Sequence, residues 1–145
     1  MKLVLQRVKQ ADVKVDSEIV GAIGVGVLVF LGISKDDSSE LADYFVQKIC
    51  QLRMFEDAQG KMNLSALDIT ADFLVVSQFT LYGDCRKGRR PSFDQAAEPA
   101  QAEMLYDYFI KQLKQQTVKV ESGRFRAMME VSLVNDGPVT FILES

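Results

Sequence analysis

Two short polar segments carry the residues that could do chemistry: SQFTLYG at residues 77–83 and NDGPVT at residues 135–140. Each follows an apolar stretch and combines hydroxyl or amide side chains with residues that shape the backbone. The chain contains no histidine, so imidazole cannot serve as general base, proton shuttle or metal ligand. Any catalysis must therefore come from hydroxyls, backbone dipoles or the substrate itself.

Each segment taken alone also has a purely structural interpretation. Asp136, Gly137 and Pro138 are typical of a turn between two antiparallel strands, because glycine adopts unusual backbone conformations and proline fixes φ. The polar residues 77–80 fit a strand end whose side chains hydrogen-bond a turn. A serine or threonine without a base is no nucleophile, so neither segment alone identifies a reaction.

A cluster of cations follows the first segment. Arg86, Lys87, Arg89 and Arg90 place four positive charges within five positions, where they could contact phosphates, although a solvated loop tip is the simpler interpretation. The whole chain has 17 basic and 20 acidic residues, a formal charge of −3 and a pI near 5.0. This balance argues against a protein that coats nucleic acid by bulk electrostatics.

The two cysteines and a glycine triplet do not indicate a cofactor. Cys50 and Cys85 form no C-x-x-C pair, and without histidine no zinc ligand set is complete, so we expect reduced thiols, no metal and no cofactor. Glycines at 21, 24 and 26 resemble part of a dinucleotide-binding pattern. A strand-like apolar run follows them at residues 27–31 instead of a helix, which excludes that site.

The elements that must position the polar segments can be predicted from periodicity. Residues 73–76 form a continuous apolar run typical of a strand buried on both faces, and its end delivers Ser77. Ser38 or Ser39 should cap a first helix, and Pro99 should begin a second that ends near Gln116. We expect a short hairpin at residues 54–62, a turn at 122–123, and further strands at residues 3–5, 13–15, 19–20, 25–33, 118–120, 129–133 and 139–143.

Length and composition predict one domain over residues 1–145. The chain is 48% hydrophobic and 26% charged, as in ordinary globular proteins. No apolar run reaches the ~18 residues that a membrane span needs, and the start lacks a signal-peptide pattern, so we expect a cytoplasmic protein. The predicted fold is a single mixed α/β domain, with two main helices on one side of a strongly curved or two-layered sheet.

Considered together, the two segments closely resemble the bacterial type of the D-aminoacyl-tRNA deacylase family. The resemblance covers essentially the whole chain, and its further motifs are QRV at 6–8, KMNL at 61–64, RPSF at 90–93, LYDYF at 105–109 and SGRF at 122–125. It implies a homodimeric α/β/β hydrolase that cleaves the ester between a D-amino acid and the terminal adenosine of tRNA. Glycine mischarged on tRNA(Ala) would also be accepted, which makes the enzyme a proofreading one.

The resemblance also implies how handedness is sensed. Gly137 and Pro138 would form a cis peptide that enters the other subunit's pocket, where their carbonyls face the Cα of the bound aminoacyl group. A rigid wall there rejects every L side chain at once and lets glycine pass. Arg7 would brace this element by hydrogen bonds to carbonyls, a role for which the alternative is a simple surface ion pair.

The remaining family positions line the opposite wall. Ser77, Gln78, Phe79 and Thr80 would form it, with backbone N–H groups near Phe79 and Thr80 stabilising the oxyanion. The hydroxyls of Ser77 and Thr80 would position water or substrate. Nothing adjacent in sequence deprotonates Thr80, although a spatial neighbour could, so we favour the 2′-hydroxyl of the tRNA's terminal ribose as the catalytic assistant.

An adenosine pocket is implied by two further positions. Phe125 and Met129 would hold the flat base, although core packing alone would explain both residues. Arg126 and Met128 stand where family members more often carry a small and an acidic residue, so the grip on the base or the first phosphate should differ here.

Three other functions compete with this interpretation. A noncatalytic RNA-end or nucleotide-binding module would leave D-tyrosyl-tRNA intact, and a dimerising structural domain would show no tRNA-dependent activity. A promiscuous small-ester hydrolase would not distinguish D from L substrates. Comparing deacylation of D- and L-charged tRNA tests the substrate, the reaction and the chiral filter together.

Overall fold

The computed structural model describes residues 1–117 and 119–145, which form a single α/β domain with a mixed sheet and two α-helices. The elements in chain order are β1 (Lys2–Val15), β2 (Glu18–Ile23), β3 (Gly26–Gly32), α1 (Ser39–Gln51), β4 (Phe55–Glu56), β5 (Met62–Leu64), β6 (Asp72–Ser77), the 3₁₀ turn η1 (Phe79–Tyr82), α2 (Pro99–Gln116), β7 (Val120–Ser122) and β8 (Glu130–Glu144). Neither of the two helices is long and apolar enough to cross a membrane, as judged over these described residues.

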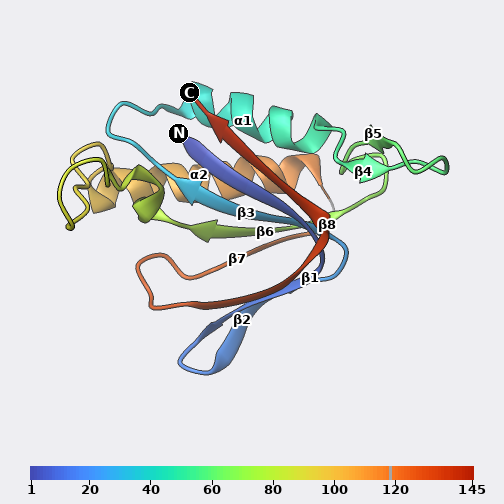
Figure 1. Ribbon diagram of the computed structural model, residues 1–145, viewed down its shortest axis with the longest axis horizontal. Coiled ribbons are helices and arrows are strands. Elements are labelled where there is room, and N and C mark those ends of the chain that lie inside the picture. The colour runs from blue at the N-terminus through green and yellow to red at the C-terminus, as the bar shows by residue number, and fades with distance from the viewer. Residues whose placement is uncertain (118) are drawn as a thin grey trace.

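The six-stranded sheet is built around the long strand β1. Its order is β2-β1-β3-β6-β7, and β8 also pairs with β1. The first half of β1 pairs with β3, the second half with β2, and β8 runs antiparallel along nearly its whole length. Because β1 serves two partners in succession, the sheet curves strongly and part of it folds beneath the rest (Figure 1). The predicted curved mixed sheet is confirmed.

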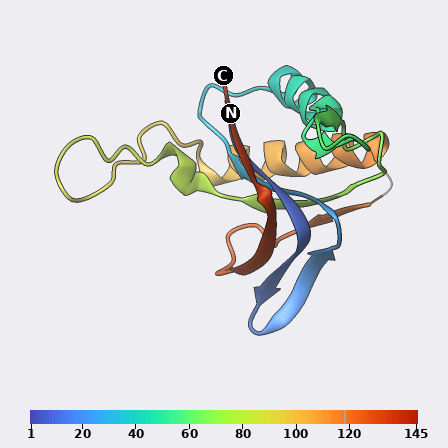
Figure 2. The ribbon, with the colours of Figure 1, turned by 45° about the vertical axis from the view of Figure 1, so that its right-hand side comes forward.

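Apolar side chains on both faces of β6 hold the layers together. Phe73 and Val75 belong to the main core, under helices α1 and α2. Leu74 and Val76 point the other way, into a second cluster that includes Val13 of β1. Both helices cover one face of the sheet (Figures 1 and 2). The second cluster joins buried side chains of β1, β2, β3 and β6. The strand predicted to be buried on both faces therefore forms the centre of the fold.

The helix starts follow local sequence signals. Ser38 caps α1, and its hydroxyl accepts a hydrogen bond from the Leu41 N–H at 3.4 Å. Pro99 occupies the first turn of α2, where its missing N–H costs no hydrogen bond. The Tyr108 hydroxyl of α2 donates to Asp43 of α1 at 3.0 Å and ties the two helices to each other.

One predicted strand was wrong in position. We expected a strand at residues 118–120 and a turn at 122–123, whereas β7 spans Val120–Ser122; residue 118 lies outside the described residues. Parallel pairing with β6 explains the shift, because Phe73 aligns with Val120 and Val75 aligns with Ser122. The apolar pattern of the segment could not reveal this register.

The hairpin turn considered for residues 136–138 was also wrong. The flanking segments do not pair with each other: Asn135 lies opposite Val8 and Thr140 opposite Gln6, so both continue one antiparallel ladder with β1. Between these pairs, residues 136–139 of β8 stand opposite the single residue Arg7 of β1, so β8 forms a bulge there. The Asn135 side chain closes it, since its Oδ1 accepts from the Val139 N–H at 2.8 Å and its Nδ2 donates to Thr140 Oγ1 at 3.1 Å. We call residues 135–140 the β8 bulge.

Candidate active site

A cavity of about 670 Å³ opens where the parallel strands β3, β6 and β7 end. Ligands of α/β sheets commonly bind at the carboxyl ends of parallel strands, because the loops that follow the strands diverge there. We call this space the β6 cavity. Its lining includes Leu31, Ser77, Gln78, Phe79, Phe93, Ala97, Pro99, Phe125, Arg126, Met128 and Met129.

The polar wall of the β6 cavity is set by the end of β6. The Gln78 N–H donates to the Leu31 carbonyl at 2.9 Å, which extends the pairing with β3 one residue beyond Ser77. The chain then turns into η1. In the part of the chain that the structure describes, the N–H groups of Phe79 and Thr80 donate to no protein acceptor. They are free to bind a negatively charged oxygen.

The hydroxyl of Thr80 has one hydrogen-bond partner among the described residues, the side-chain amide of Gln78, which donates to it. An amide cannot take a proton from a hydroxyl, so this contact orients Thr80 without activating it. Of the predicted residues 77–80, Ser77, Gln78 and Phe79 line the β6 cavity, whereas Thr80 is not part of its lining. Among the described residues, this wall presents no group recognisable as an activated nucleophile.

Two aromatic rings flank the mouth of the β6 cavity. Phe79 is 57% exposed, and its ring centroid lies 4.9 Å from that of Phe93. Phe93 was not among the residues predicted from sequence, although it belongs to the RPSF segment at 90–93. An exposed aromatic pair beside a cavity is suited to a ligand with a flat or apolar part.

Phe125 and Met129 lie in the opposite wall and also pack against the core. The Phe125 ring lies 5.8 Å from that of Tyr106, and Met129 contacts the second core cluster. The Tyr106 hydroxyl donates to the Val75 carbonyl at 2.8 Å, and burial raises its pKa. Phe125 and Met129 therefore both line the cavity and pack against the core.

Arg126 and Met128 form part of the rim. Arg126 adopts a left-handed backbone conformation with φ of 59°, and Met128 is 91% exposed. Arg126 makes no ion pair with any residue that the structure describes. Arg126 and Met128 therefore present a cation and a thioether at the entrance.

Arg7 lies under the β8 bulge and is only 4% exposed. Its Nε donates to the Asp136 carbonyl at 3.1 Å and its Nη1 to the Met54 carbonyl at 2.8 Å, while Nη2 lies 3.4 Å from Glu56 Oε1. This burial does not fit a simple surface ion pair. Sequence analysis missed the partners Met54 and Glu56, because no local pattern links them to Arg7.

The β8 bulge requires glycine at 137. Gly137 has φ of +127°, and a Cβ there would lie 2.7 Å from Val139 Cγ2 and 3.1 Å from Arg7 Nη2. The peptide bond between Gly137 and Pro138 is cis, and both residues are exposed. Neither lines the β6 cavity of its own chain. The structure thus brings residues 77–79, 125 and 129 together and places Arg7, Gly137 and Pro138 elsewhere.

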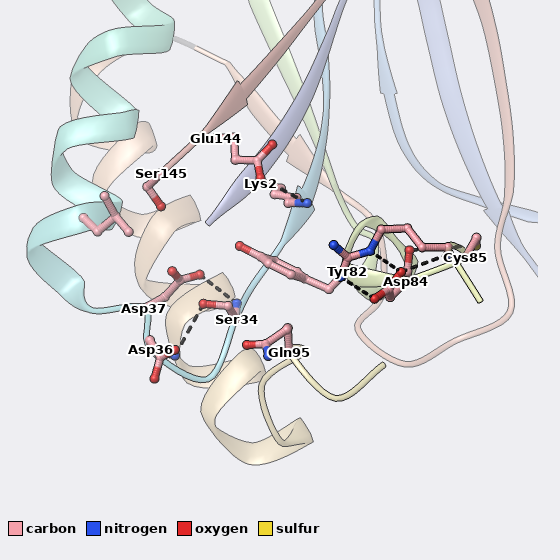
Figure 3. A pocket seen from close by; sticks show the side chains of 13 residues that line it. Lys2, Ser34, Asp36, Asp37, Tyr82, Asp84, Cys85, Gln95, Glu144 and Ser145 are labelled. Carbon is pink, nitrogen blue, oxygen red and sulfur yellow. Dashed lines mark hydrogen bonds and ion pairs between the residues drawn. The ribbon is translucent and has the colours of Figure 1, made fainter. Parts of the chain in front are cut away.

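A second hollow of about 890 Å³ lies between the chain ends and η1 (Figure 3). Several of its charges pair with one another: Lys2 Nζ lies 3.2 Å from Glu144, and Arg86 Nη2 lies 2.6 Å from Asp84. Burial raises the pKa of Tyr82 to about 12, so its hydroxyl stays protonated at neutral pH. Because these groups are paired or neutral, the β6 cavity is the better candidate.

The predicted basic cluster lies on an exposed loop that projects from the body of the protein between η1 and α2 (Figure 2). The described residues contain no group of three or more histidine, cysteine or acidic side chains that could hold a metal ion. Cys50 and Cys85 are free, and burial raises the pKa of Cys50 to about 11. A protonated, buried thiol is unreactive.

Comparisons with known proteins agree over the full chain. A family model described as D-Tyr-tRNA(Tyr) deacylase matches residues 4–144. A D-aminoacyl-tRNA deacylase of Geotalea uraniireducens (strain Rf4) is 59% identical over 145 residues, covering 100% of this chain and 94% of its own. The D-aminoacyl-tRNA deacylase of Bacillus cytotoxicus is 57% identical, with 100% and 99% covered.

Two solved structures share the fold. One, named c-Myc DNA Unwinding Element Binding Protein, has a TM-score of 0.95 at 44% identity, with 100% of this chain and 99% of that chain covered. The other, described as a probable eukaryotic D-amino acid tRNA deacylase, has a TM-score of 0.86 at 20% identity, with 98% and 97% covered. At 20% identity, this second structure shows only that the two proteins share a fold.

Proposed function

The chain belongs to the D-Tyr-tRNA(Tyr) deacylase family, and from this premise we propose that it is a hydrolase that releases D-amino acids from D-aminoacyl-tRNA. The family match over residues 4–144 carries the proposal. The β6 cavity supports it independently, because it combines free backbone donors with aromatic walls. Such a substrate would place the protein in the cytoplasm.

The proposed reaction is attack of water on the ester carbonyl. The water oxygen bonds to the carbonyl carbon, and the resulting oxyanion accepts hydrogen bonds from the N–H groups of Phe79 and Thr80. Collapse of this intermediate breaks the ester bond, and the ribose oxygen leaves as a hydroxyl after it takes up the proton that water gave up. One donor of this kind lowers a barrier by about 2.7–4 kcal/mol.

We assign Gln78, Ser77 and the Thr80 hydroxyl to positioning. The Gln78 amide that donates to Thr80 leaves that hydroxyl without a base, so a water molecule assisted by the substrate's 2′-hydroxyl is the better route. This assignment needs neither a metal ion nor a cofactor. It also explains how a chain without histidine can catalyse an acyl transfer.

Selection of the D form is assigned to Gly137 and Pro138 of a second subunit. Three features support this: Gly137 and Pro138 are exposed, Arg7 holds the β8 bulge from below, and the bulge does not line the cavity of its own chain. Apolar Ile142 on the same strand is 69% exposed, which suits a homodimer contact. A backbone wall close to Cα would reject L side chains and admit glycine, so glycyl-tRNA(Ala) is also a proposed substrate.

Phe125 and Met129 are assigned to the terminal adenine. An aromatic face and a polarizable thioether in the cavity wall can hold a flat base. Arg126 at the rim would then lie on the phosphate side of the adenosine. The 44% identical structure is named for binding a DNA element, but the formal charge of −3 here does not favour binding along a nucleic acid.

The decisive assay compares tRNA charged with D-tyrosine and with L-tyrosine. We expect rapid release of D-tyrosine and no measurable release of L-tyrosine. Equal hydrolysis of both forms would indicate a chirality-insensitive esterase. Binding of tRNA without hydrolysis would indicate an RNA-binding module, and neither binding nor hydrolysis would indicate a structural domain.

A further inference from the structure

We propose that the exposed basic loop, residues 84–92, grips the phosphates of the tRNA acceptor arm through Lys87, Arg89 and Arg90, whereas Arg86 acts only to hold the loop. This inference rests on the proposed function, since it concerns how the same substrate is bound. It divides the four cations into two classes by their contacts.

Arg86 is neutralised within its own loop. Its Nε and Nη2 donate to Asp84 Oδ1 and Oδ2 at 2.9 and 2.6 Å, and its backbone N–H donates to Oδ1 at 3.0 Å. The hydrogen bonds from Arg86 lower the pKa of Asp84 below its usual range, so the pair stays ionised. A guanidinium held by both carboxylate oxygens has little left to offer a phosphate.

The base of the loop is closed by a backbone bridge. The Asp84 N–H donates to the Ser92 carbonyl at 2.8 Å, and the Ser92 N–H donates to the Asp84 carbonyl at 3.0 Å. Gly88 at the tip has φ of +71°, which turns the chain back. The bridge and the Arg86 contact therefore define the ends of the loop and leave its tip projecting.

The other three cations have no such partner. Lys87, Arg89 and Arg90 are exposed, and across residues 1–117 and 119–145 none of them lies within ion-pair distance of a carboxylate. No carboxylate of the described residues pairs with these cations, although the chain as a whole carries a formal charge of −3. A partner with many negative charges fits such a cluster of unpaired cations on an acidic protein better than a neutral partner does.

The loop stands beside the entrance of the β6 cavity. Phe93 follows the loop directly and lines the cavity, and its ring packs against that of Phe79 with a centroid distance of 4.9 Å. A substrate whose last nucleotide enters the cavity must extend its preceding phosphates outward past this rim. An RNA strand fits the free cations better than an acidic peptide does, because its charges recur at every nucleotide.

The test measures kcat/KM for D-tyrosyl-tRNA against salt concentration in the triple variant K87Q/R89Q/R90Q. Each phosphate contact contributes a slope of about 0.7 in log K per log salt for single strands and about 0.9 for duplexes. We expect the slope to fall by about 2 and kcat/KM at low salt to fall about tenfold or more. Arg86→Gln should leave the slope unchanged.

Two controls separate this proposal from the proposed function. K48Q/K111Q/K114Q removes three exposed cations from the helices and should behave like the unchanged protein. D-tyrosyl-adenosine, which lacks the acceptor arm, should be cleaved equally by the loop variant. An unchanged slope in the loop variant, an equal loss on D-tyrosyl-adenosine, or an equal loss in the control would overturn the proposal.

If the unchanged protein cleaves neither substrate, the proposed function fails while the loop can still be judged. Binding of uncharged tRNA, measured by fluorescence anisotropy against salt, should then weaken in the loop variant and not in K48Q/K111Q/K114Q. Equal binding by all three proteins would reject the phosphate contact on its own.

Discussion

The β6 cavity and the β8 bulge differ in how completely one chain builds them. The cavity has two polar and aromatic walls supplied by residues far apart in the same chain, such as Gln78 and Phe125. The bulge is equally well held, by Arg7 and by Asn135, yet Gly137 and Pro138 are exposed and outside that cavity. An exposed element that lies outside the cavity of its own chain fits the proposed role, in which Gly137 and Pro138 enter the cavity of a second copy.

Of the substitutions considered, Gly137→Ala should reduce activity most. The added Cβ would lie 2.7 Å from Val139 Cγ2 in a backbone conformation that favours glycine, so the bulge must shift. Because a misplacement of about 1 Å can cost about 10²-fold in rate, we expect kcat/KM for D-tyrosyl-tRNA to fall about a hundredfold. Thermal unfolding should show that the variant remains folded; activity within twofold of the original would contradict the role of the bulge.

A substitution in the β6 cavity should weaken substrate binding without changing the preference for the D form. Phe125→Leu removes the aromatic face while keeping an apolar side chain in the wall. Stacking of a base on an aromatic ring contributes about 1–3 kcal/mol, so KM should rise about tenfold with the D-to-L preference intact. Steady-state kinetics on both charged forms measures this, and a lost preference with unchanged KM would reverse the assignment.

Arg7→Lys tests the support of the bulge with the charge retained. Lysine cannot reach the Asp136 and Met54 carbonyls together as the guanidinium does. Loss of one charged hydrogen bond should lower the free energy of unfolding by about 1.5–3 kcal/mol, measured by urea denaturation. Hydrolysis of L-tyrosyl-tRNA should become detectable; a destabilised variant that still rejects the L form would make Arg7 purely structural.

Thr80→Ala should have the smallest effect. The lost hydroxyl accepts one hydrogen bond from Gln78, a contact of about 1 kcal/mol, so kcat should fall only about fivefold. Removal of a true nucleophile costs about 10⁶-fold in a serine protease. Single-turnover deacylation distinguishes the two, and a loss of several orders of magnitude would make Thr80 the nucleophile.

Local sequence signals predicted the parts of the fold that depend on local chemistry. The apolar run of β6, the Ser38 cap and Pro99 of α2 each act through their own neighbours, and each appeared as expected. Gly137 and Pro138 favour turns, so their local pattern predicts a hairpin where the structure has a bulge. What overrides that preference is pairing of both flanks with β1, more than a hundred residues earlier in the chain.

The site residues divide in the same way, into those that the sequence pointed to and those that only tertiary contacts reveal. The family resemblance pointed to Ser77, Phe79, Phe125 and Met129, and the structure gathers all four around one cavity. Phe93, the Met54 carbonyl and the Asp84 contact of Arg86 were missed, because they arise from tertiary packing or from a short side-chain contact that charge counting ignores.

Mixing two damaged subunits tests most directly whether the bulge of one chain serves the cavity of another. Ala97→Trp would fill the cavity, whose lining includes Ala97, and Gly137→Ala would displace the bulge. Each variant alone should be strongly impaired, Gly137→Ala by about a hundredfold, whereas a mixed dimer combines one intact cavity with the intact bulge of the partner. We predict that mixing restores D-tyrosyl-tRNA deacylation; two folded variants that exchange subunits and stay as impaired as each is alone would contradict the account.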